Sequence, residues 1–126
     1  MESLRVLIVD DEDELVSALA QRLNLRGFQA EGLTTGAEAL AYLEVTPCDV
    51  VLLDVKMPGI GGLELIKRIK EQRPELQVIL LTGWSSAEDA RKGKELGAYD
   101  YLMKPVKIDD LVKVLLSAAA RGEGKP

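Results

Sequence analysis

The residues of this chain best suited to chemistry are polar side chains that directly follow short apolar runs. The run 6–9 ends in two aspartates, the run 50–53 in one aspartate, the run 78–81 in a threonine and the run 99–103 in a lysine. These residues are Asp10, Asp11, Asp54, Thr82 and Lys104. Each also has a purely structural interpretation, because aspartate caps helices and opens turns, threonine hydroxyls satisfy loop amides, and lysine can be a solvated strand end. None of them, taken singly, requires a functional explanation.

The three aspartates gain meaning when they are taken together. If the runs 6–9 and 50–53 are neighbouring parallel strands, Asp10, Asp11 and Asp54 meet at the carboxyl edge of one sheet, where ligands of such sheets bind. Three adjacent carboxylates repel one another unless a cation joins them or some of them are protonated. The chain has no histidine and one cysteine, so the ligands must be oxygen atoms. A site of this composition favours Mg²⁺.

A carboxylate beside Mg²⁺ can act as a nucleophile toward a phosphoryl group. The attack needs other groups that compensate the charge on the transferring oxygens. Lys104 can supply an ammonium and Thr82 a hydroxyl donor, and Gly83 leaves space beside that hydroxyl. The five polar residues therefore predict phosphoryl chemistry at Asp54.

The elements that must position these residues alternate between strand and helix. Strand-like apolar runs at 6–9, 28–30, 50–53, 78–81 and 99–103 are followed by segments of helical periodicity at 15–23, 37–43, 63–69, 87–96 and 108–120. Strands with little internal alternation, each followed by a helix, predict a parallel sheet covered on both faces, with right-handed crossovers. The predicted fold is a doubly wound α/β sandwich of (βα)₅ type.

Length and composition are consistent with one domain. The chain has 126 residues, of which 47% are hydrophobic, enough for one core. We assign residues 1–121 to that domain and 122–126, which have linker composition, to a tail or the start of a linker.

The charge balance argues against two kinds of partner. A net charge of −5, from 16 basic and 21 acidic residues, gives no support to binding of nucleic acid or anionic lipid.

No apolar run approaches the length of a membrane span, and the first residues lead into a strand rather than a secretory signal. Cys48 cannot form an internal disulfide and is expected to be a small buried hydrophobe. We therefore expect a cytoplasmic protein.

Four segments of the chain resemble the signature segments of bacterial two-component response-regulator receiver domains, the family of chemotaxis-Y-like proteins. The segments are LIVDD at 7–11, LDVKMPG at 53–59, LTG at 81–83 and YDYLMKP at 99–105. Their order and their positions at strand ends match that family over nearly the whole chain. The resemblance implies a flavodoxin-like fold with the sheet order 2-1-3-4-5.

The resemblance also implies a role for individual residues. Asp54 would be the phosphoacceptor, on a Mg²⁺ site where Mn²⁺ can substitute. The metal ligands would be Asp10, Asp11, Asp54 and the main-chain carbonyl of Lys56. The phosphoryl group would be stabilised by Thr82, Gly83 and Lys104. Thr82 and Tyr101 would form the switch pair, and the Lys104–Pro105 peptide bond would be cis.

The implied partners are proteins. A sensor histidine kinase or a histidine phosphotransfer protein would supply the phosphoryl group, and a downstream protein or a fused effector would read the surface formed by the fourth helix, fifth strand and fifth helix. The same surface could form a homodimer. The chain departs from many relatives at Gly61, where they carry Asp or Asn, so the following helix is expected to be weakly capped. Lys56 and Trp84 would flank the entrance for a hydrolytic water.

Two other functions fit the sequence less well. A Mg²⁺ phosphohydrolase of the haloacid-dehalogenase type would need a second acid two residues after Asp54, where Lys56 stands. The other alternative is a flavin-binding or purely structural α/β module. A flavin-binding module would be expected to show a Ser/Thr-rich phosphate loop, which this chain lacks. The glycine-rich stretch 59–62 also lacks the Gly-Lys-Ser/Thr ending of a nucleotide-binding loop and is expected to be a plain loop.

Overall fold

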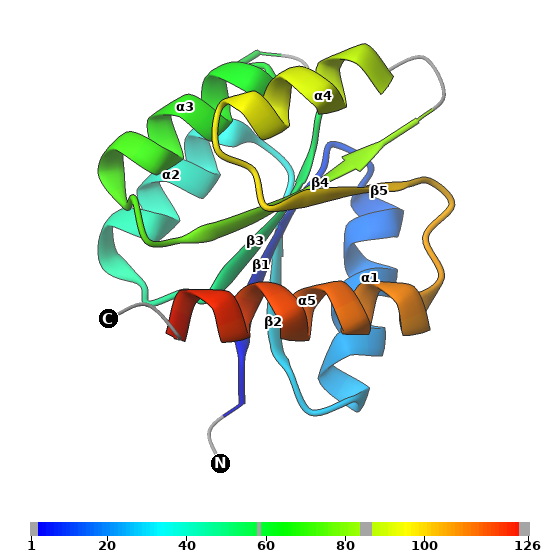
Figure 1. Ribbon diagram of the computed structural model, residues 1–126. Coiled ribbons are helices and arrows are strands. Elements are labelled where there is room, and N and C mark those ends of the chain that lie inside the picture. Colours follow the sequence, from blue (N-terminus) through cyan, green and yellow to red (C-terminus); the bar gives the residue numbers. More distant parts are fainter. Residues whose placement is uncertain (1–2, 58, 84–86, 124–126) are drawn as a thin grey trace.

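The computed structural model describes residues 3–57, 59–83 and 87–123, which form one five-stranded parallel sheet with helices on both faces (Figure 1). Strand order is β2-β1-β3-β4-β5, and every neighbouring pair is parallel. The strands are β1 Arg5–Val9, β2 Gln29–Leu33, β3 Val50–Asp54, β4 Gln77–Thr82 and β5 Asp100–Met103. The helices are α1 Asp13–Leu25, α2 Gly36–Val45, α3 Gly62–Gln72, α4 Ala87–Glu95 and α5 Ile108–Glu123. The predicted (βα)₅ fold and its sheet order are confirmed.

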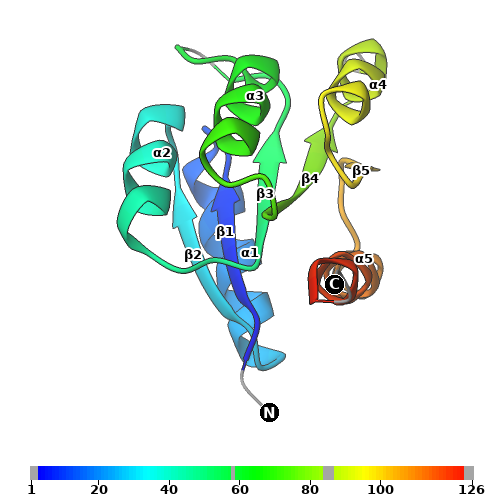
Figure 2. The ribbon, with the colours of Figure 1, turned by 60° about the vertical axis from the view of Figure 1, so that its left-hand side comes forward.

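The sheet divides the apolar core into two layers. Successive side chains of β3 point to opposite faces: Val51 and Leu53 pack with α2 and α3, whereas Val50 and Leu52 pack with α1 and α5. Figure 2 shows α2, α3 and α4 on one side of the sheet and α1 and α5 on the other. Because β3 is buried on both faces, its sequence is a continuous apolar run rather than an alternating one.

Strand β2 is the element whose limits the sequence predicted least well. The run 28–30 was expected, but the strand covers Gln29–Leu33 and pairs with β1 from Arg5 to Val9. β2 lies at the edge of the sheet and is only partly buried, so its composition is less apolar than that of the central strands. Its pairing is set by β1 rather than by its own apolar content.

Two features of the core bear on earlier expectations. Cys48 is buried, and burial raises the pKa of its thiol to about 11, so the side chain stays protonated and behaves as a small hydrophobe. Among the described residues, none of the helices combines the length and the hydrophobicity that a membrane span requires.

Candidate functional site

The carboxyl edge of the sheet brings the three predicted aspartates together. Val9 of β1 lies opposite Leu53 of β3, so the residues that follow these two positions reach the same place. Asp10, Asp11 and Asp54 each offer a ligand atom, and these atoms all lie within 4.8 Å of one another. Asp10 and Asp54 are buried, whereas Asp11 is exposed.

Lys104 reaches this cluster from β5, the far edge of the sheet. Its main-chain amide donates to the carbonyl oxygen of Thr82 at 2.8 Å, which extends the β4–β5 pairing by one residue. Its ammonium lies 2.8 Å from Asp10 Oδ2 and 3.6 Å from Asp54 Oδ2. The Lys104–Pro105 peptide bond is cis. The sheet thus places one cation against two buried carboxylates that come from different strands.

The ionisation of Asp54 is perturbed by these surroundings. Burial and the nearby charge of Asp10 raise the pKa of Asp54 from 3.8 to about 6. Lys104 and the main-chain amide of Lys56, which donates to Asp54 Oδ1 at 3.3 Å, act in the opposite direction but do not cancel the increase. The neighbouring ammonium and amide therefore do not fully stabilise the carboxylate form of Asp54.

The charge state of Lys104 is secure. Burial lowers the pKa of this ammonium, but the close carboxylate of Asp10 and the charge of Asp54 outweigh burial and raise the pKa above its ordinary value. The lysine therefore remains a cation at neutral pH.

The acidic cluster fits a hard divalent cation. Asp10 Oδ1 accepts a hydrogen bond from the amide of Glu12 at 3.0 Å, whereas the fully buried Oδ2 accepts no hydrogen bond of normal geometry and has Lys104 as its charged neighbour. A buried carboxylate oxygen without a regular donor, beside two further carboxylates, is the donor set that Mg²⁺ takes together with water. The residues present therefore suit the metal that the sequence predicted.

The predicted switch residues lie on neighbouring strands, Thr82 at the end of β4 and Tyr101 on β5. Thr82 is fully buried, and its hydroxyl donates to the carbonyl oxygen of Gly83 at 3.1 Å. Tyr101 lies on β5 with 40% of its surface exposed. A Cβ added to Gly83 would meet nothing within 4 Å. Trp84 lies outside the described residues.

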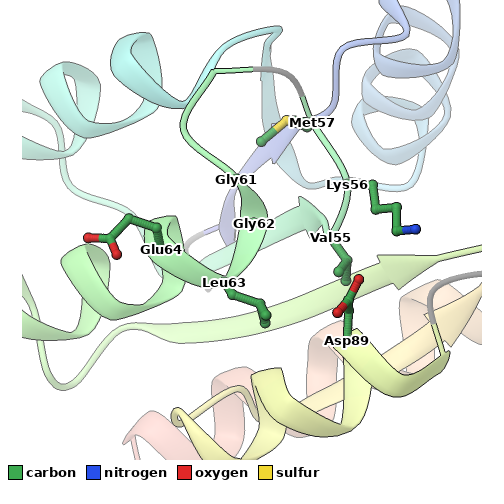
Figure 3. Close-up of a pocket in the computed structure, with 8 residues that line it drawn as sticks. All are labelled: Val55, Lys56, Met57, Gly61, Gly62, Leu63, Glu64 and Asp89. Atoms are coloured by element: carbon green, nitrogen blue, oxygen red, sulfur yellow. The ribbon is translucent and has the colours of Figure 1, made fainter.

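A groove adjoins the site without containing Asp54. It has a volume of about 520 Å³ and lies between the connection from β3 to α3, the first turn of α3 and Asp89 of α4 (Figure 3). Val55 and Lys56, which follow Asp54, line one side of it. Gly61 is the N-cap residue of α3 and makes no side-chain capping hydrogen bond, in agreement with the weak capping predicted there. The groove therefore lies beside the carboxylate cluster and does not include its three aspartates.

Sequence reasoning missed one residue of the site. Glu12 Oε1 lies 3.3 Å from the Lys104 ammonium, so the lysine contacts a third carboxylate in addition to Asp10 and Asp54. The pattern gave Glu12 no role, because it follows the aspartate pair as a polar residue at the start of a helix. A contact between residues 92 positions apart is set by the sheet order and not by local spacing.

The fold and the acidic edge define a class: a doubly wound α/β module with a lysine-paired carboxylate cluster where its central strands end. The chain belongs to the response regulator receiver domain family, whose model matches residues 6–116. It is therefore a receiver domain of two-component signalling, a kind of domain that is generally not a conventional enzyme and that generally binds Mg²⁺.

Individual relatives support this assignment. The transcriptional regulatory protein TcrA of Mycobacterium tuberculosis is 35% identical over 119 residues, which cover 94% of this chain and 47% of that protein. A CheY-like receiver domain from Methanospirillum hungatei is 32% identical with a TM-score of 0.91, covering 97% of this chain and 98% of that one. Full-length FixJ of B. japonicum is 29% identical with a TM-score of 0.92, covering 98% of this chain and 61% of that one. The chain spans about half the length of TcrA and of the RegX3 proteins that it also matches.

Proposed function

We propose that Asp54 accepts a phosphoryl group from a phosphohistidine of a partner protein, and that this changes the surface formed by α4, β5 and α5. The observation that carries the proposal is the meeting of Asp10, Asp11 and Asp54 with the Lys104 ammonium at one sheet edge. The donor would be a sensor histidine kinase or a histidine phosphotransfer protein, since this chain has no histidine.

The transfer follows from the groups at the edge. A carboxylate oxygen of Asp54 attacks phosphorus, the bond from phosphorus to the donor's imidazole nitrogen breaks, and its electron pair returns to that nitrogen. Asp10, Asp11, Asp54 and the main-chain carbonyl of Lys56 would hold Mg²⁺, or Mn²⁺ in its place, which neutralises charge on the phosphoryl oxygens. Lys104 supplies an ammonium to the same oxygens, and the hydroxyl of Thr82 together with the open space at Gly83 supplies a donor.

The output surface is supported by the exposure of its apolar residues. Exposed apolar side chains on or next to the three elements α4, β5 and α5 are Leu96, Tyr101, Met103 and Leu116. These elements lie next to one another in Figure 1. We propose that this surface binds a downstream protein, an attached effector or a second copy of the chain. The proposal includes a cytoplasmic domain of residues 1–121, with 122–126 as a tail or the start of a linker.

Phosphate uptake by the purified chain tests the proposal. Incubation with Mg²⁺ and acetyl phosphate should add the mass of one phosphoryl group, and peptide mapping should place it on Asp54. The same reaction in EDTA should show little uptake, because no metal ion then balances the three carboxylates and the incoming phosphoryl group. A mapped phosphate on another residue, or equal uptake with and without Mg²⁺, would contradict the proposed site.

A Thr82→Ala variant separates phosphorylation from its consequence. We expect the variant to take up phosphate, because the acceptor, the metal ligands and Lys104 are unchanged. The response should weaken, since no hydroxyl is left to turn from Gly83 toward the phosphoryl group. The measured quantity is the ratio of partner affinity, or of self-association where that is the output, between phosphorylated and unphosphorylated protein. We expect this ratio to be below about tenfold in the variant and above about tenfold in the wild type. Ultracentrifugation or calorimetry measures this ratio. An equal ratio in the variant and the wild type would count against the switch role of Thr82.

A further inference from the structure

Among the residues that the structure describes, Glu12 is the one acid that pairs with the Lys104 ammonium without belonging to the cluster of Asp10, Asp11 and Asp54. The three carboxylates that could share an ion are Asp10, Asp11 and Asp54. The Glu12 carboxylate lies 3.3 Å from the lysine ammonium, and 64% of the Glu12 side chain is exposed. Lys104 itself is only 21% exposed, and its ammonium pairs with two buried acids, Asp10 and Asp54, and one exposed acid.

The main chain fixes Glu12 relative to the cluster. Its amide donates to Asp10 Oδ1 at 3.0 Å, and the residue is the N-cap of α1, where its side chain makes no capping hydrogen bond. The carboxylate is therefore not used by the helix. Glu12 belongs to the connection after β1, whereas Lys104 follows β5, which lies two strands beyond β3 in the sheet. The two side chains contact each other across this distance.

A divalent cation changes what Lys104 can contact. Asp10 and Asp54, which now lie 2.8 and 3.6 Å from the ammonium, are also two of the three acids that could bind the ion. Ion and ammonium repel each other and share the same partners. Three described acids lie within ion-pair distance of the Lys104 ammonium, and of these Glu12 alone lies outside the set that could bind the ion.

We propose that Glu12 is a positioning residue that holds Lys104 at the site when Asp10 and Asp54 turn to a divalent cation. In this role Glu12 lowers the cost of metal binding and keeps the ammonium within reach of a phosphoryl group. The inference rests on the proposed Mg²⁺ site and concerns a residue outside its ligand set.

A double-mutant cycle on Mg²⁺ affinity tests the proposal. Calorimetry on the unphosphorylated chain should show that Glu12→Gln weakens Mg²⁺ binding about three- to fivefold, as expected for one partly exposed ion pair. The control Glu14→Gln removes the same charge from an exposed residue of the first turn of α1 and should weaken binding less than about 1.5-fold. In a Lys104→Met background, the effect of Glu12→Gln should fall to that of the control, because the lysine that it positions is gone.

A second measurement follows the lysine directly. In the Mg²⁺-loaded protein, the NMR order parameter of the Lys104 side chain should fall in Glu12→Gln and stay at the wild-type value in Glu14→Gln. Equal effects of Glu12→Gln and Glu14→Gln, or an effect of Glu12→Gln that persists undiminished without Lys104, would overturn the positioning role alone. A wild-type chain that binds no Mg²⁺ would overturn the proposed metal site and this inference with it.

Discussion

An Asp54→Asn variant is expected to take up no phosphate from acetyl phosphate in the presence of Mg²⁺, whereas the wild type gains one phosphoryl group. The carboxamide of asparagine is not a usable nucleophile toward phosphorus, and it removes one of the three charges of the cluster. We expect a loss of at least about 10³-fold in the rate of uptake, the order of effect seen when a catalytic group is removed. Intact-mass spectrometry over a time course measures it.

The matched control removes an aspartate charge near the site without touching the cluster. Asp89 lines the far side of the groove next to Val55 and Lys56, so Asp89→Asn tests whether loss of a nearby charge alone is sufficient. We expect Asp89→Asn to keep most of the uptake. Stable incorporation by Asp54→Asn at the wild-type rate would remove Asp54 from the acceptor role.

The same substitution should stabilise the fold in the absence of metal. The folded-state pKa of Asp54 is raised from 3.8 to about 6, chiefly by burial and by Asp10. Between these two values the folded state binds more protons than the unfolded state, so the contribution of Asp54 to stability is fully present below about pH 4 and is lost as the pH rises through about 6. The loss is of the order of 2 kcal/mol after allowance for solvent screening.

Asp54→Asn has no charge to bury and should not show this decrease. In EDTA its urea midpoint at pH 7 should exceed that of the wild type, and the difference between the two should disappear near pH 4. Saturating Mg²⁺ should reverse the order, because the ion binds the folded wild type and stabilises it by mass action. A pH profile that is the same for both proteins in EDTA would show that Asp54 is not the strained carboxylate of this edge.

The central part of the fold was predictable because burial there is complete. β3 and β4 are buried along their whole length, so their sequences are apolar runs that end abruptly in Asp54 and Thr82. The parallel sheet then brings these ends to one edge, and the convergence of Asp10, Asp11 and Asp54 follows from topology. The edge strand β2 was less predictable, since half-burial leaves its composition mixed.

The features that escaped prediction depend on side-chain direction. The contact of Glu12 with Lys104 requires the sheet order as well as the reach of two long side chains, and neither is encoded in local spacing. Likewise, the hydroxyl of Thr82 bonds to the carbonyl of Gly83, which no sequence pattern specifies. A pattern of residue types can predict which groups gather at an edge, but the partner of each group is decided by packing.

A Gly62→Ala variant is expected to lose about 2–4 kcal/mol of unfolding free energy. A Cβ at Gly62 would lie 2.3 Å from the carbonyl oxygen of Val55 and 2.7 Å from its carbonyl carbon and Cα. These are main-chain atoms, so relief requires the connection after β3 to move, with loss of the hydrogen bond from the Gly62 amide to Val55 O at 3.0 Å. Overpacking and a lost hydrogen bond together account for the expected cost.

The position of Gly62 links this cost to function. Val55 directly follows Asp54, and the Val55 amide donates to the carbonyl oxygen of Leu81 on β4. A displaced Val55 would therefore shift Asp54 relative to β4. We therefore expect Gly62→Ala to weaken Mg²⁺ binding as well as to lower the urea midpoint. Gly61→Ala is the matched control: it is one residue away, has ordinary extended backbone angles and has nothing within 4 Å of an added Cβ. Its unfolding free energy should stay within about 0.5 kcal/mol of the wild type. Equal midpoints for the two variants would show that α3 does not depend on this close approach, and that Gly62 does not fix the geometry of the acceptor.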